Sequence, residues 1–375
     1  MNQLTTLQEQ ILLQLYHYRC ATYTHLYRYI CRDHTAIHEA VNQLIEADFI
    51  ERDDLKEGDD EIYFFLSKGL KQAKKLIKHQ DPNQPLTHRT TKELRLAPRA
   101  YAHYVETLDF VLEAEAYLKT QQIPYQVKLT GNFQTFDPVK PDAVIQVGNT
   151  LFLVETDMLT ERSKRLREKM RRYQLLAAKR AGYEDSLPQV VVLFSYYRQP
   201  TAVNLTHLYE AIGTESINSF SSSLDFLAGR SQDLLHLFQT ELIPEALGKE
   251  APYRQINYTV MKKHLASEGV VPGFFKTNPT TAKGKVFDYG FAKQTSAGIQ
   301  YQTLVIDLTI PRLSRLCTLH YLKNTLTDWA RKGRFHKEGE VIVLIDESKC
   351  NTMQLILKAI GWESQPYIRF IKKRS

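Results

Sequence analysis

Three carboxylates lie close together in the sequence, in a pattern that suits chemistry on phosphate groups. Asp142 opens an apolar run, PDAVIQV, and Glu155 and Asp157 end the next run, TLFLVETD. Gly148-Asn149 separates the two runs and is a typical hairpin turn. A hairpin that turns there brings Asp142 beside the end of the second strand. We therefore expect the three carboxylates to converge on one edge of a sheet.

The second run contains the residues LFLV, which indicate a buried strand. Carboxylates at the end of a buried strand are costly unless a positive group meets them. Oxygen ligands of this kind suit Mg²⁺ or Mn²⁺. An ion held by Asp142, Glu155 and Asp157 would offset the cost, polarise a phosphoryl oxygen and activate a water molecule. The sequence therefore predicts a metal site with Asp142 and Glu155 as catalytic residues.

A strongly basic helix is expected directly after these strands. Residues 161–180 include nine basic and two acidic residues. The apolar stripe of this helix consists of Leu166, Met170, Tyr173 and Ala177. Lys169 lies one position beside the stripe, so we expect it to reach the sheet edge, as a catalytic residue that stabilises phosphate charge or orients water. Outward-facing arginines would contact phosphates: Arg165, Arg171 and Arg172. Alternatively, Lys169 only neutralises Glu155 or Asp157 in an ion pair, and the helix is a solvated face.

The N-terminal region has the pattern of a small DNA-binding module. Helices are expected over 7–17, 22–31 (with Thr22 as its cap) and 34–47, followed by the strands FIER and EIYFFLS and a basic helix over 66–77. This order is that of a winged helix, whose third helix enters the major groove. Polar residues on that helix are candidates for DNA contacts: His34, Thr35, His38 and Asn42. Alternatively, the module binds protein or only packs, and the acidic turn between its two strands is unfavourable for contact with phosphate.

Composition and charge indicate the class of protein and the kind of partner. The chain has 375 residues and a net charge of +7, which favours a polyanionic partner. Its four cysteines are scattered and its N-terminus lacks a signal-peptide pattern, so we expect a cytoplasmic protein. No apolar run approaches the ~18 residues of a membrane span. The expected domains are a winged helix over 1–80, a linker over 81–98, an α/β domain over 99–215 and a second α/β domain over 253–375.

The C-terminal third repeats the order of the central domain. FDYGFA and YQTLVIDLTI resemble the two strands of the acid-bearing hairpin, and EVIVLIDES resembles PQVVVLFSYY. Asp288, Asp307 and Lys323 would fall near the places of Asp142, Glu155 and Lys169. This second domain is either a degenerate copy or carries a metal site of its own. Residues 214–229, TESINSFSSSLDFLAG, are expected to form a loop. The predicted fold class is thus multidomain α/β.

The acidic pattern resembles that of the PD-(D/E)xK nuclease superfamily, which implies a restriction-endonuclease-like mixed-sheet domain. Asp142 matches the first acid and Glu155 the second, whereas Asp157 stands where that pattern has a lysine. In some members the lysine comes from the following helix, a part that Lys169 would take. Many members also have an acid on a helix before the first strand, and Glu106, with His103 alongside, is the nearest match.

The winged-helix order together with LSKG, KPDA, FLVETD and REKMRRY resembles the replication-relaxation family, over about residues 7–212. That family overlaps the MOB-C class of conjugative relaxases. The resemblance implies a protein of a plasmid or integrative element that recognises an origin in double-stranded DNA and nicks supercoiled DNA, with relaxosome or coupling proteins as partners.

Three functions fit these observations. The first is a metal-dependent DNA-nicking relaxase that uses Mg²⁺ or Mn²⁺. The second is an origin-binding accessory or replication protein on a nuclease-like fold that has no catalytic activity, which the substitution at Asp157 favours. The third is a nuclease of a defence system. The chain has 21 tyrosines, and tyrosines at helical spacing are more often core residues than nucleophiles, so none is assigned as catalytic.

Overall fold

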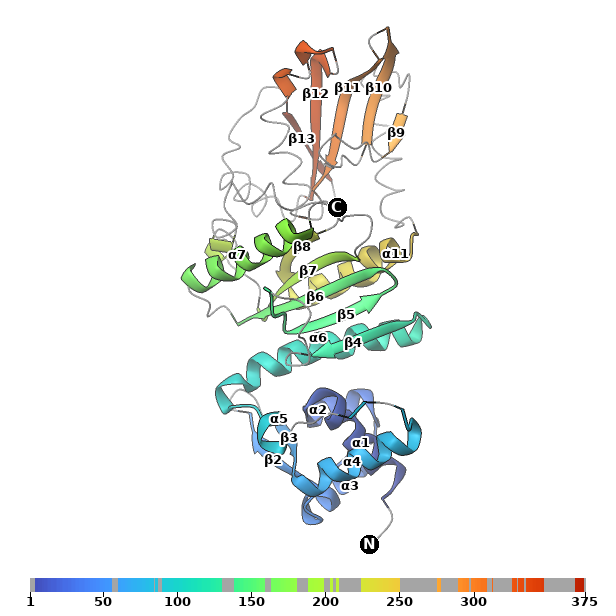
Figure 1. Cartoon of the computed structure of the whole chain (residues 1–375), viewed down its shortest axis with the longest axis vertical. Helices are drawn as coiled ribbons and strands as arrows, with labels where there is room; N and C mark the ends of the chain where they lie inside the picture. Colours follow the sequence, from blue (N-terminus) through green and yellow to red (C-terminus); the bar gives the residue numbers. More distant parts are fainter. Residues whose placement is uncertain are drawn as a thin grey trace. The chain divides into compact units, whose positions relative to one another are not determined.

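The computed structural model divides the chain into two compact units, Met1–Gln122 and Ile123–Ser375 (Figure 1). The structure describes residues 4–55, 60–83, 85–86, 90–129, 138–158, 163–180, 188–198, 203–204, 207–208, 224–249, 275–277, 289–296, 298–308, 312, 326–328, 330–333, 335–346 and 368–373. The sequence pattern also predicts a helix over 201–212, which lies largely outside these residues. No helix in the described ranges combines the length and apolar character needed to cross a bilayer.

The first unit begins with helices and a small sheet. In chain order its elements are α1 (Thr6–Tyr18), β1 (Cys20–Thr22), α2 (Tyr23–Tyr29), α3 (His34–Glu46), β2 (Ile50–Asp54), β3 (Glu61–Phe65) and α4 (Ser67–Gln80). The helices and the β2–β3 hairpin are those that the sequence predicts. β1 was not predicted, and it pairs antiparallel with β3, so the sheet has the order β1-β3-β2.

Local side-chain caps explain where these helices begin. Thr5 and Gln8 form a reciprocal capping box at α1, and Thr22 and His25 form another at α2. The Thr22 hydroxyl accepts a hydrogen bond from the backbone N–H of His25 at 3.1 Å, which confirms the predicted cap. Asp33 accepts a hydrogen bond from the backbone N–H of Ala36 in the same way at α3.

A glycine allows α4 to approach the chain that leads into β2. A Cβ atom at Gly69 would lie 2.0 Å from the carbonyl oxygen of Phe49, so only glycine fits at this position. The backbone N–H of Leu66 donates to the same carbonyl oxygen. Leu70, Ala73 and Ile77 on this side of α4 are buried. The LSKG sequence therefore closes α4 onto the core of the first unit.

Three further helices complete the first unit: α5 (Thr91–Leu94), the 3₁₀ turn η1 (Pro98–Ala100) and the long α6 (Tyr101–Thr120). Hydrogen bonds join α6 to the elements before it. The Tyr104 hydroxyl donates to the Tyr18 carbonyl oxygen at 2.9 Å, and the Tyr101 hydroxyl donates to Asp53 at 2.9 Å. His25 Nε2 lies 2.9 Å from Asp109 Oδ1.

The second unit contains a five-stranded mixed sheet with the order β4-β5-β6-β7-β8. Its strands are β4 (Tyr125–Leu129), β5 (Ala143–Val147), β6 (Thr150–Asp157), β7 (Gln189–Tyr196) and β8 (Leu224–Arg230). β4, β5 and β6 are antiparallel, whereas β7 and β8 run parallel to β6. The β5–β6 turn lies at Gly148-Asn149 as predicted, with Gly148 at φ +54°. The loop expected over 214–229 is wrong in its last part, because β8 begins at Leu224.

Helices cover both faces of this sheet. α7 (Ser163–Arg180) lies over the face that carries Glu155, because Lys169 and Tyr173 contact that side chain. The other face is covered by a run of helices: α10 (Ser231–Leu237), the π-helical segment η2 (Phe238–Leu242) and α11 (Ile243–Ala246). Phe152 on β6 meets Phe238 there, with ring centroids 5.0 Å apart.

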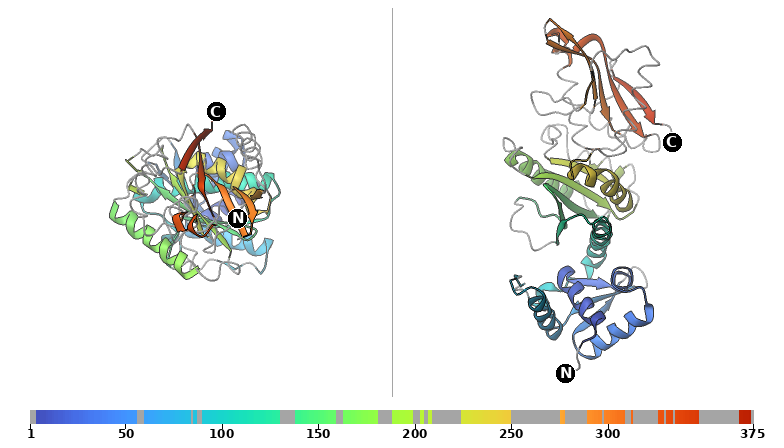
Figure 2. Two further views of the ribbon diagram at one scale, coloured as in Figure 1. Left: turned by 90° about the horizontal axis from the view of Figure 1, so that it is seen from above. Right: turned by 90° about the vertical axis from the view of Figure 1, so that its right-hand side faces the viewer.

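A second five-stranded sheet has the same topology as the first (Figures 1 and 2). Its strands are β9 (Phe275–Thr277), β10 (Tyr289–Thr295), β11 (Gly298–Asp307), β12 (Phe335–Asp346) and β13 (Ile368–Lys373), in the order β13-β12-β11-β10-β9. β9, β10 and β11 are antiparallel, and β12 and β13 run parallel to β11. The repeated order of strands that the sequence indicates is therefore present.

Candidate functional site

The β5–β6 hairpin places Asp142 opposite Glu155. Ala143 pairs with Val154, and the backbone N–H of Asp142 donates to the Val154 carbonyl oxygen at 2.9 Å, which continues the register by one residue. The Asp142 carboxylate accepts a hydrogen bond from the backbone N–H of Thr156 at 2.9 Å. Directly opposite residues of an antiparallel pair point to the same face. The hairpin therefore creates an acid pair, Asp142 and Glu155, at its open end, on two inner strands of the sheet.

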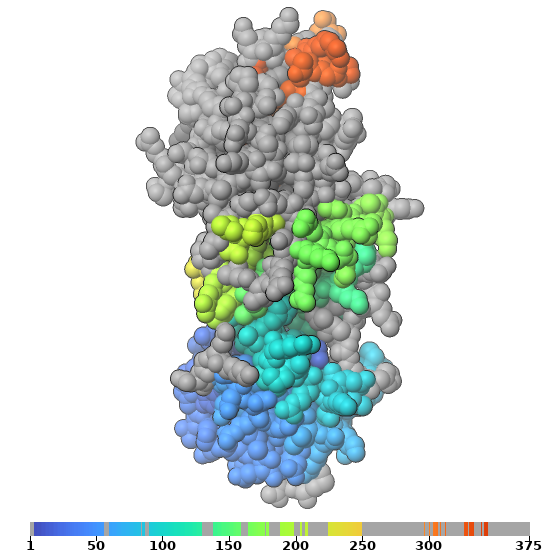
Figure 3. All heavy atoms as spheres, turned by 90° about the vertical axis from the view of Figure 1, so that its left-hand side faces the viewer, coloured from blue at the N-terminus to red at the C-terminus, as the bar shows by residue number. Residues whose placement is uncertain are grey.

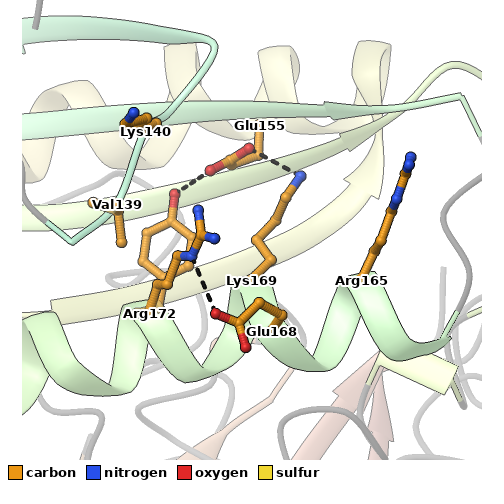
Figure 4. A pocket seen from close by; sticks show the side chains of 8 residues that line it. Val139, Lys140, Glu155, Arg165, Glu168, Lys169 and Arg172 are labelled. Atoms are coloured by element: carbon orange, nitrogen blue, oxygen red, sulfur yellow. Dashed lines mark hydrogen bonds and ion pairs between the residues drawn. The ribbon is translucent and has the colours of Figure 1, made fainter.

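Two residues of α7 hold the Glu155 carboxylate (Figure 4). The Tyr173 hydroxyl donates to Glu155 Oε1 at 2.5 Å. Lys169 Nζ forms an ion pair with Glu155 Oε2 at 3.1 Å and lies over the Phe194 ring, 5.3 Å from its centroid. Because Lys169 and Tyr173 are four residues apart, they lie one above the other on the same face of the helix. Each oxygen of Glu155 therefore has a partner from α7.

Burial changes the pKa of the Glu155 carboxyl group. Glu155 is 3% exposed, and loss of hydration raises its pKa to about 7. Lys169 and the hydrogen bond from Tyr173 act to lower this pKa, while the charge of Asp142 raises it. The pKa of Tyr173 is raised well above its ordinary value, first by burial and then by Glu155. Tyr173 is therefore a neutral hydrogen-bond donor at physiological pH.

A basic pocket of about 210 Å³ opens above Glu155 (Figure 4). Four cationic side chains and two acidic ones line it, together with Val139 and Tyr173: Lys140, Arg165, Lys169, Arg172, Glu155 and Glu168. Arg172 Nε lies 3.5 Å from Glu168, and both side chains are about half exposed, so this ion pair is weak. The green atoms of α7 lie at the molecular surface in Figure 3. The pocket thus offers an excess of positive charge to an anion from solution.

The predicted arginines divide into two groups. Arg165 and Arg172 line the pocket, whereas Arg171 is exposed on α7 and does not. Leu166, Met170 and Tyr173 of the predicted apolar stripe are buried. The helical spacing therefore predicted correctly which side of α7 faces the sheet. The roles of Lys169 and the arginines in chemistry or phosphate binding stay predictions.

Asp157, the third carboxylate, ends β6 and is 5% exposed. Among the described residues, no three or more His, Cys, Asp or Glu side chains are grouped so that they could hold a metal ion. The structure thus brings two of the predicted ligands, Asp142 and Glu155, opposite each other, and it does not gather all three into such a group. The part of Asp157 as a third ligand stays a prediction.

The candidate DNA contacts lie on α3. The His34 ring stacks on Tyr27, with centroids 4.0 Å apart, and its Nδ1 lies 3.1 Å from the Tyr23 hydroxyl. Thr35 is exposed. The Asn42 amide lies 3.1 Å from His38 Nδ1, one helical turn away. His34 is thus packed against tyrosines, and His38 and Asn42 contact each other. Their contact with bases stays a prediction.

Glu106, the predicted helix acid, lies on α6 in the first unit. Burial and the charge of Asp109 raise its pKa to about 7. Its neighbour His103 accepts a hydrogen bond from Thr107 through its carbonyl oxygen, at 3.0 Å. The structure describes both residues within the first unit, and the assignment of Glu106 as an additional acid of the site stays a prediction.

Sequence reasoning assigned Tyr173 to the apolar stripe and missed its contact with Glu155. The signal was present, because Tyr173 lies four residues after Lys169, and a buried tyrosine hydroxyl usually has a polar partner. The missing information was the position of Glu155 beneath this turn of α7. That position depends on packing between helix and sheet.

The fold and site together define a mixed α/β protein with an acid pair on the sheet and a basic pocket above it, an arrangement that suits phosphate groups. The model of the replication-relaxation family matches residues 12–189. This match spans most of the first unit, the acid pair and α7, and it ends at the first residue of β7. No curated protein and no solved structure matches the chain. The similarity to this family supports a role in plasmid replication or DNA relaxation.

Proposed function

We propose that the chain binds DNA at an origin of a plasmid or integrative element and nicks one strand, as a relaxase-like endonuclease. The observation that carries the proposal is the Asp142–Glu155 pair beneath a pocket lined by Lys140, Arg165, Lys169 and Arg172. Carboxylates next to cationic side chains suit phosphodiester chemistry, because negative charge develops on the phosphate oxygens during the reaction. The similarity to the replication-relaxation family supports a substrate of this class.

The acid pair also fits the PD-(D/E)xK pattern that the sequence resembles. Asp142 follows Pro141, Glu155 lies on the neighbouring strand, and Lys169 reaches Glu155 from the next helix. The element order of the first unit, with its β2–β3 hairpin after α3, supports the winged helix that the sequence predicts. We assign this unit to DNA binding as part of the same proposal.

A divalent cation fits the acid pair. Mg²⁺ is commonly held by one or two carboxylates while waters and substrate phosphates complete its shell, so two carboxylates are sufficient. Asp142 and Glu155 would hold such an ion, and Asp157 would assist. When bound, Mg²⁺ or Mn²⁺ supplies an activated water and a polarised phosphoryl oxygen.

The residues of α7 supply the remaining functions. Lys169 lies in the pocket and is 23% exposed, so a phosphate entering the pocket can take it as a partner in place of Glu155. In that position its ammonium group offsets the charge that develops on the phosphoryl oxygens. Tyr173 keeps its hydrogen bond to Glu155 and fixes the orientation of the carboxylate. Arg165 and Arg172 bind the flanking backbone.

Incubation with supercoiled plasmid carrying the protein's own origin tests the proposal. Wild type should produce open circles with Mg²⁺ or Mn²⁺, and a chelator should prevent this. Glu155→Gln removes the charge with little change in shape and should lower nicking at least a hundredfold while DNA binding persists. Glu113→Gln, at a partly exposed position of α6 that pairs with Arg28, removes one charge elsewhere and should leave nicking unchanged. If wild type nicks the plasmid with neither Mg²⁺ nor Mn²⁺, the enzymatic assignment is refuted.

A second function, an origin-binding accessory protein without chemistry, is favoured by one observation. Both oxygens of Glu155 already have partners on α7, so the acid is satisfied without a metal ion. Direct measurement of Mn²⁺ binding by electron paramagnetic resonance separates the two functions. Binding that Asp142→Asn weakens at least tenfold, with Asp233→Asn as control, supports the enzyme. The absence of Mn²⁺ binding both with and without DNA supports the accessory protein.

A further inference from the structure

Charge is divided unevenly along the sequence of the first unit. Residues 33–65, which contain α3 and the β2–β3 hairpin, include eleven carboxylates and two basic residues. The helix that follows, α4, has five lysines and no carboxylate in its fourteen residues. The α3 and hairpin region would repel a phosphate backbone, and α4 would attract it.

The lysines of α4 form one continuous face. At 100° per residue, all five fall within ~120° of the helix circumference, and they extend over ~15 Å of its length. They are Lys68, Lys71, Lys74, Lys75 and Lys78. Gly69, Leu70, Ala73 and Ile77 occupy the opposite side and are buried. The apolar side thus fixes α4 on the core, while the lysine face is turned toward solvent.

Local contacts distinguish these lysines. Lys68 donates to the Ala47 carbonyl oxygen at 2.6 Å and lies over the Phe49 ring, and Lys78 donates to the Pro82 carbonyl oxygen. No ion pair joins Lys71, Lys74 or Lys75 to a carboxylate in the described part of the chain. Lys71 and Lys75 are exposed, and Lys74 is partly exposed. These three ammonium groups are therefore available to an anionic partner.

We infer that the lysine face of α4 docks the first unit on the DNA backbone, and that α3 with the hairpin does not hold phosphate. This inference rests on the proposed DNA-binding function and adds the surface that carries it. Duplex DNA is the chosen partner because its phosphates repeat along a line, as the lysines do along α4. An anionic membrane surface would also attract lysines, and it is one of the outcomes that the test separates.

The expected effect follows from counterion release. Each phosphate contact contributes ~0.9 to the slope of log K against log salt on duplex DNA. The variant Lys71→Gln/Lys74→Gln/Lys75→Gln should therefore reduce the slope by about 2 to 3 on random-sequence duplex, measured by fluorescence anisotropy. Far-UV circular dichroism should show that it melts as the wild type does, because all three residues lie on the solvent side.

Matched variants control for charge and for position. Lys92→Gln/Arg99→Gln/Lys119→Gln removes three exposed positive charges from other parts of the same unit and should change the slope by less than 1. Glu39→Gln/Glu46→Gln removes two exposed carboxylates from α3 and should change the affinity less than twofold. If DNA lies on α3 instead, this second variant binds more tightly by a larger factor.

The outcomes separate this inference from the proposed function. A wild type that binds no duplex refutes the DNA-binding function itself. A wild type that binds duplex while the α4 variant keeps its full salt slope overturns the docking surface alone. An equal reduction of the salt slope in the α4 variant and in the Lys92→Gln/Arg99→Gln/Lys119→Gln variant also overturns the docking surface, because only total charge would then matter. An α4 variant that binds DNA normally but no longer binds phosphatidylserine vesicles likewise overturns the docking surface.

Discussion

Replacing Lys169 with methionine removes the positive charge that lies 3.1 Å from Glu155 Oε2. Methionine keeps an apolar side chain of similar length, so it still packs beside Phe194. Glu155 then remains buried beneath α7, with Asp142 opposite it and only Tyr173 as a described donor. Removing one partner of a buried ion pair is costly, because an uncompensated charge stays behind. Glu155 can limit this cost by taking up a proton.

The pKa of Glu155 determines how large the cost becomes. With Lys169 in place, burial raises this pKa to about 7, and Lys169 acts to lower it, so the variant must have a higher value. An acid with a raised folded pKa loses stability as pH rises from its unfolded value, ~4.3, through its folded value. In wild type this loss is complete soon above pH 7, and in the variant it continues. At pH 8 the extra loss is about 1.4 kcal/mol, one pH unit at 1.36 kcal/mol.

The difference in unfolding free energy is measured by urea unfolding in EDTA, with far-UV circular dichroism as the signal. Hydrogen exchange of α7 peptides shows which transition includes α7. The Lys169→Met variant should be less stable than wild type by ~1–1.5 kcal/mol at pH 8 and equal to it near pH 5.5, where Glu155 is protonated in both. Adding Glu155→Gln should abolish the pH dependence of the difference. Arg171→Met, on the exposed side of α7, should have an effect within ~0.5 kcal/mol. A deficit of the same size at both pH values would refute the reasoning.

Three further changes test other parts of the structure. Tyr173→Phe removes the donor to Glu155 and should cost ~1.5–3 kcal/mol at pH 8 in urea unfolding, and equal stability would show that the hydrogen bond contributes nothing. Gly69→Ala forces a Cβ against the Phe49 carbonyl oxygen and should destabilise the first unit by ~1–3 kcal/mol, which an unchanged melting curve would contradict. Burial raises the pKa of Glu106 to about 7, so Glu106→Gln should exceed wild type in stability at pH 8 and equal it at pH 4.5, as unfolding at both pH values would show.

Local signals were sufficient to predict the acid pair. The Gly148-Asn149 turn set the register of the β5–β6 hairpin, and that register alone places Asp142 opposite Glu155. Helical spacing placed Lys169 beside the buried stripe, within reach of Glu155. Both predictions depend on residues less than 30 positions apart in the chain. For such short separations, turn chemistry and periodicity restrict the geometry strongly.

Non-local pairing decided the features that the sequence did not reveal. β8 follows a serine-rich stretch and includes Gly229, and it becomes a strand because it pairs in parallel with β7. β1 is only three residues long and depends on its pairing with β3. The partner of the Tyr173 hydroxyl depends on how α7 packs on the sheet. In each case the decisive contact comes from another segment, which a local pattern does not encode.

The second sheet shows that this topology does not require the buried acid. In the first sheet, Glu155 is the first residue of β6 beyond the pairing of Val154 with Ala143. The corresponding residue of β11, beyond the pairing of Val305 with Tyr289, is Ile306, which is fully buried.

Asp307, expected near the place of Glu155, is the next residue of β11 after Ile306. The register is shifted by a bulge between Phe291 and Ala292, which hairpin length alone did not reveal. Asp288 and Lys323 lie outside the described residues.

One chain thus builds the same strand order with an isoleucine in one sheet and a glutamate in the other. Burying the isoleucine stabilises the sheet by ~1.5–3 kcal/mol, whereas burying a carboxylate costs free energy even when it is paired. The fold alone gives no reason for this cost at Glu155. Under the proposed function, the role of the carboxylate beneath the basic pocket accounts for this cost, and Glu155→Gln should then stabilise the metal-free protein at pH 8 while it abolishes nicking.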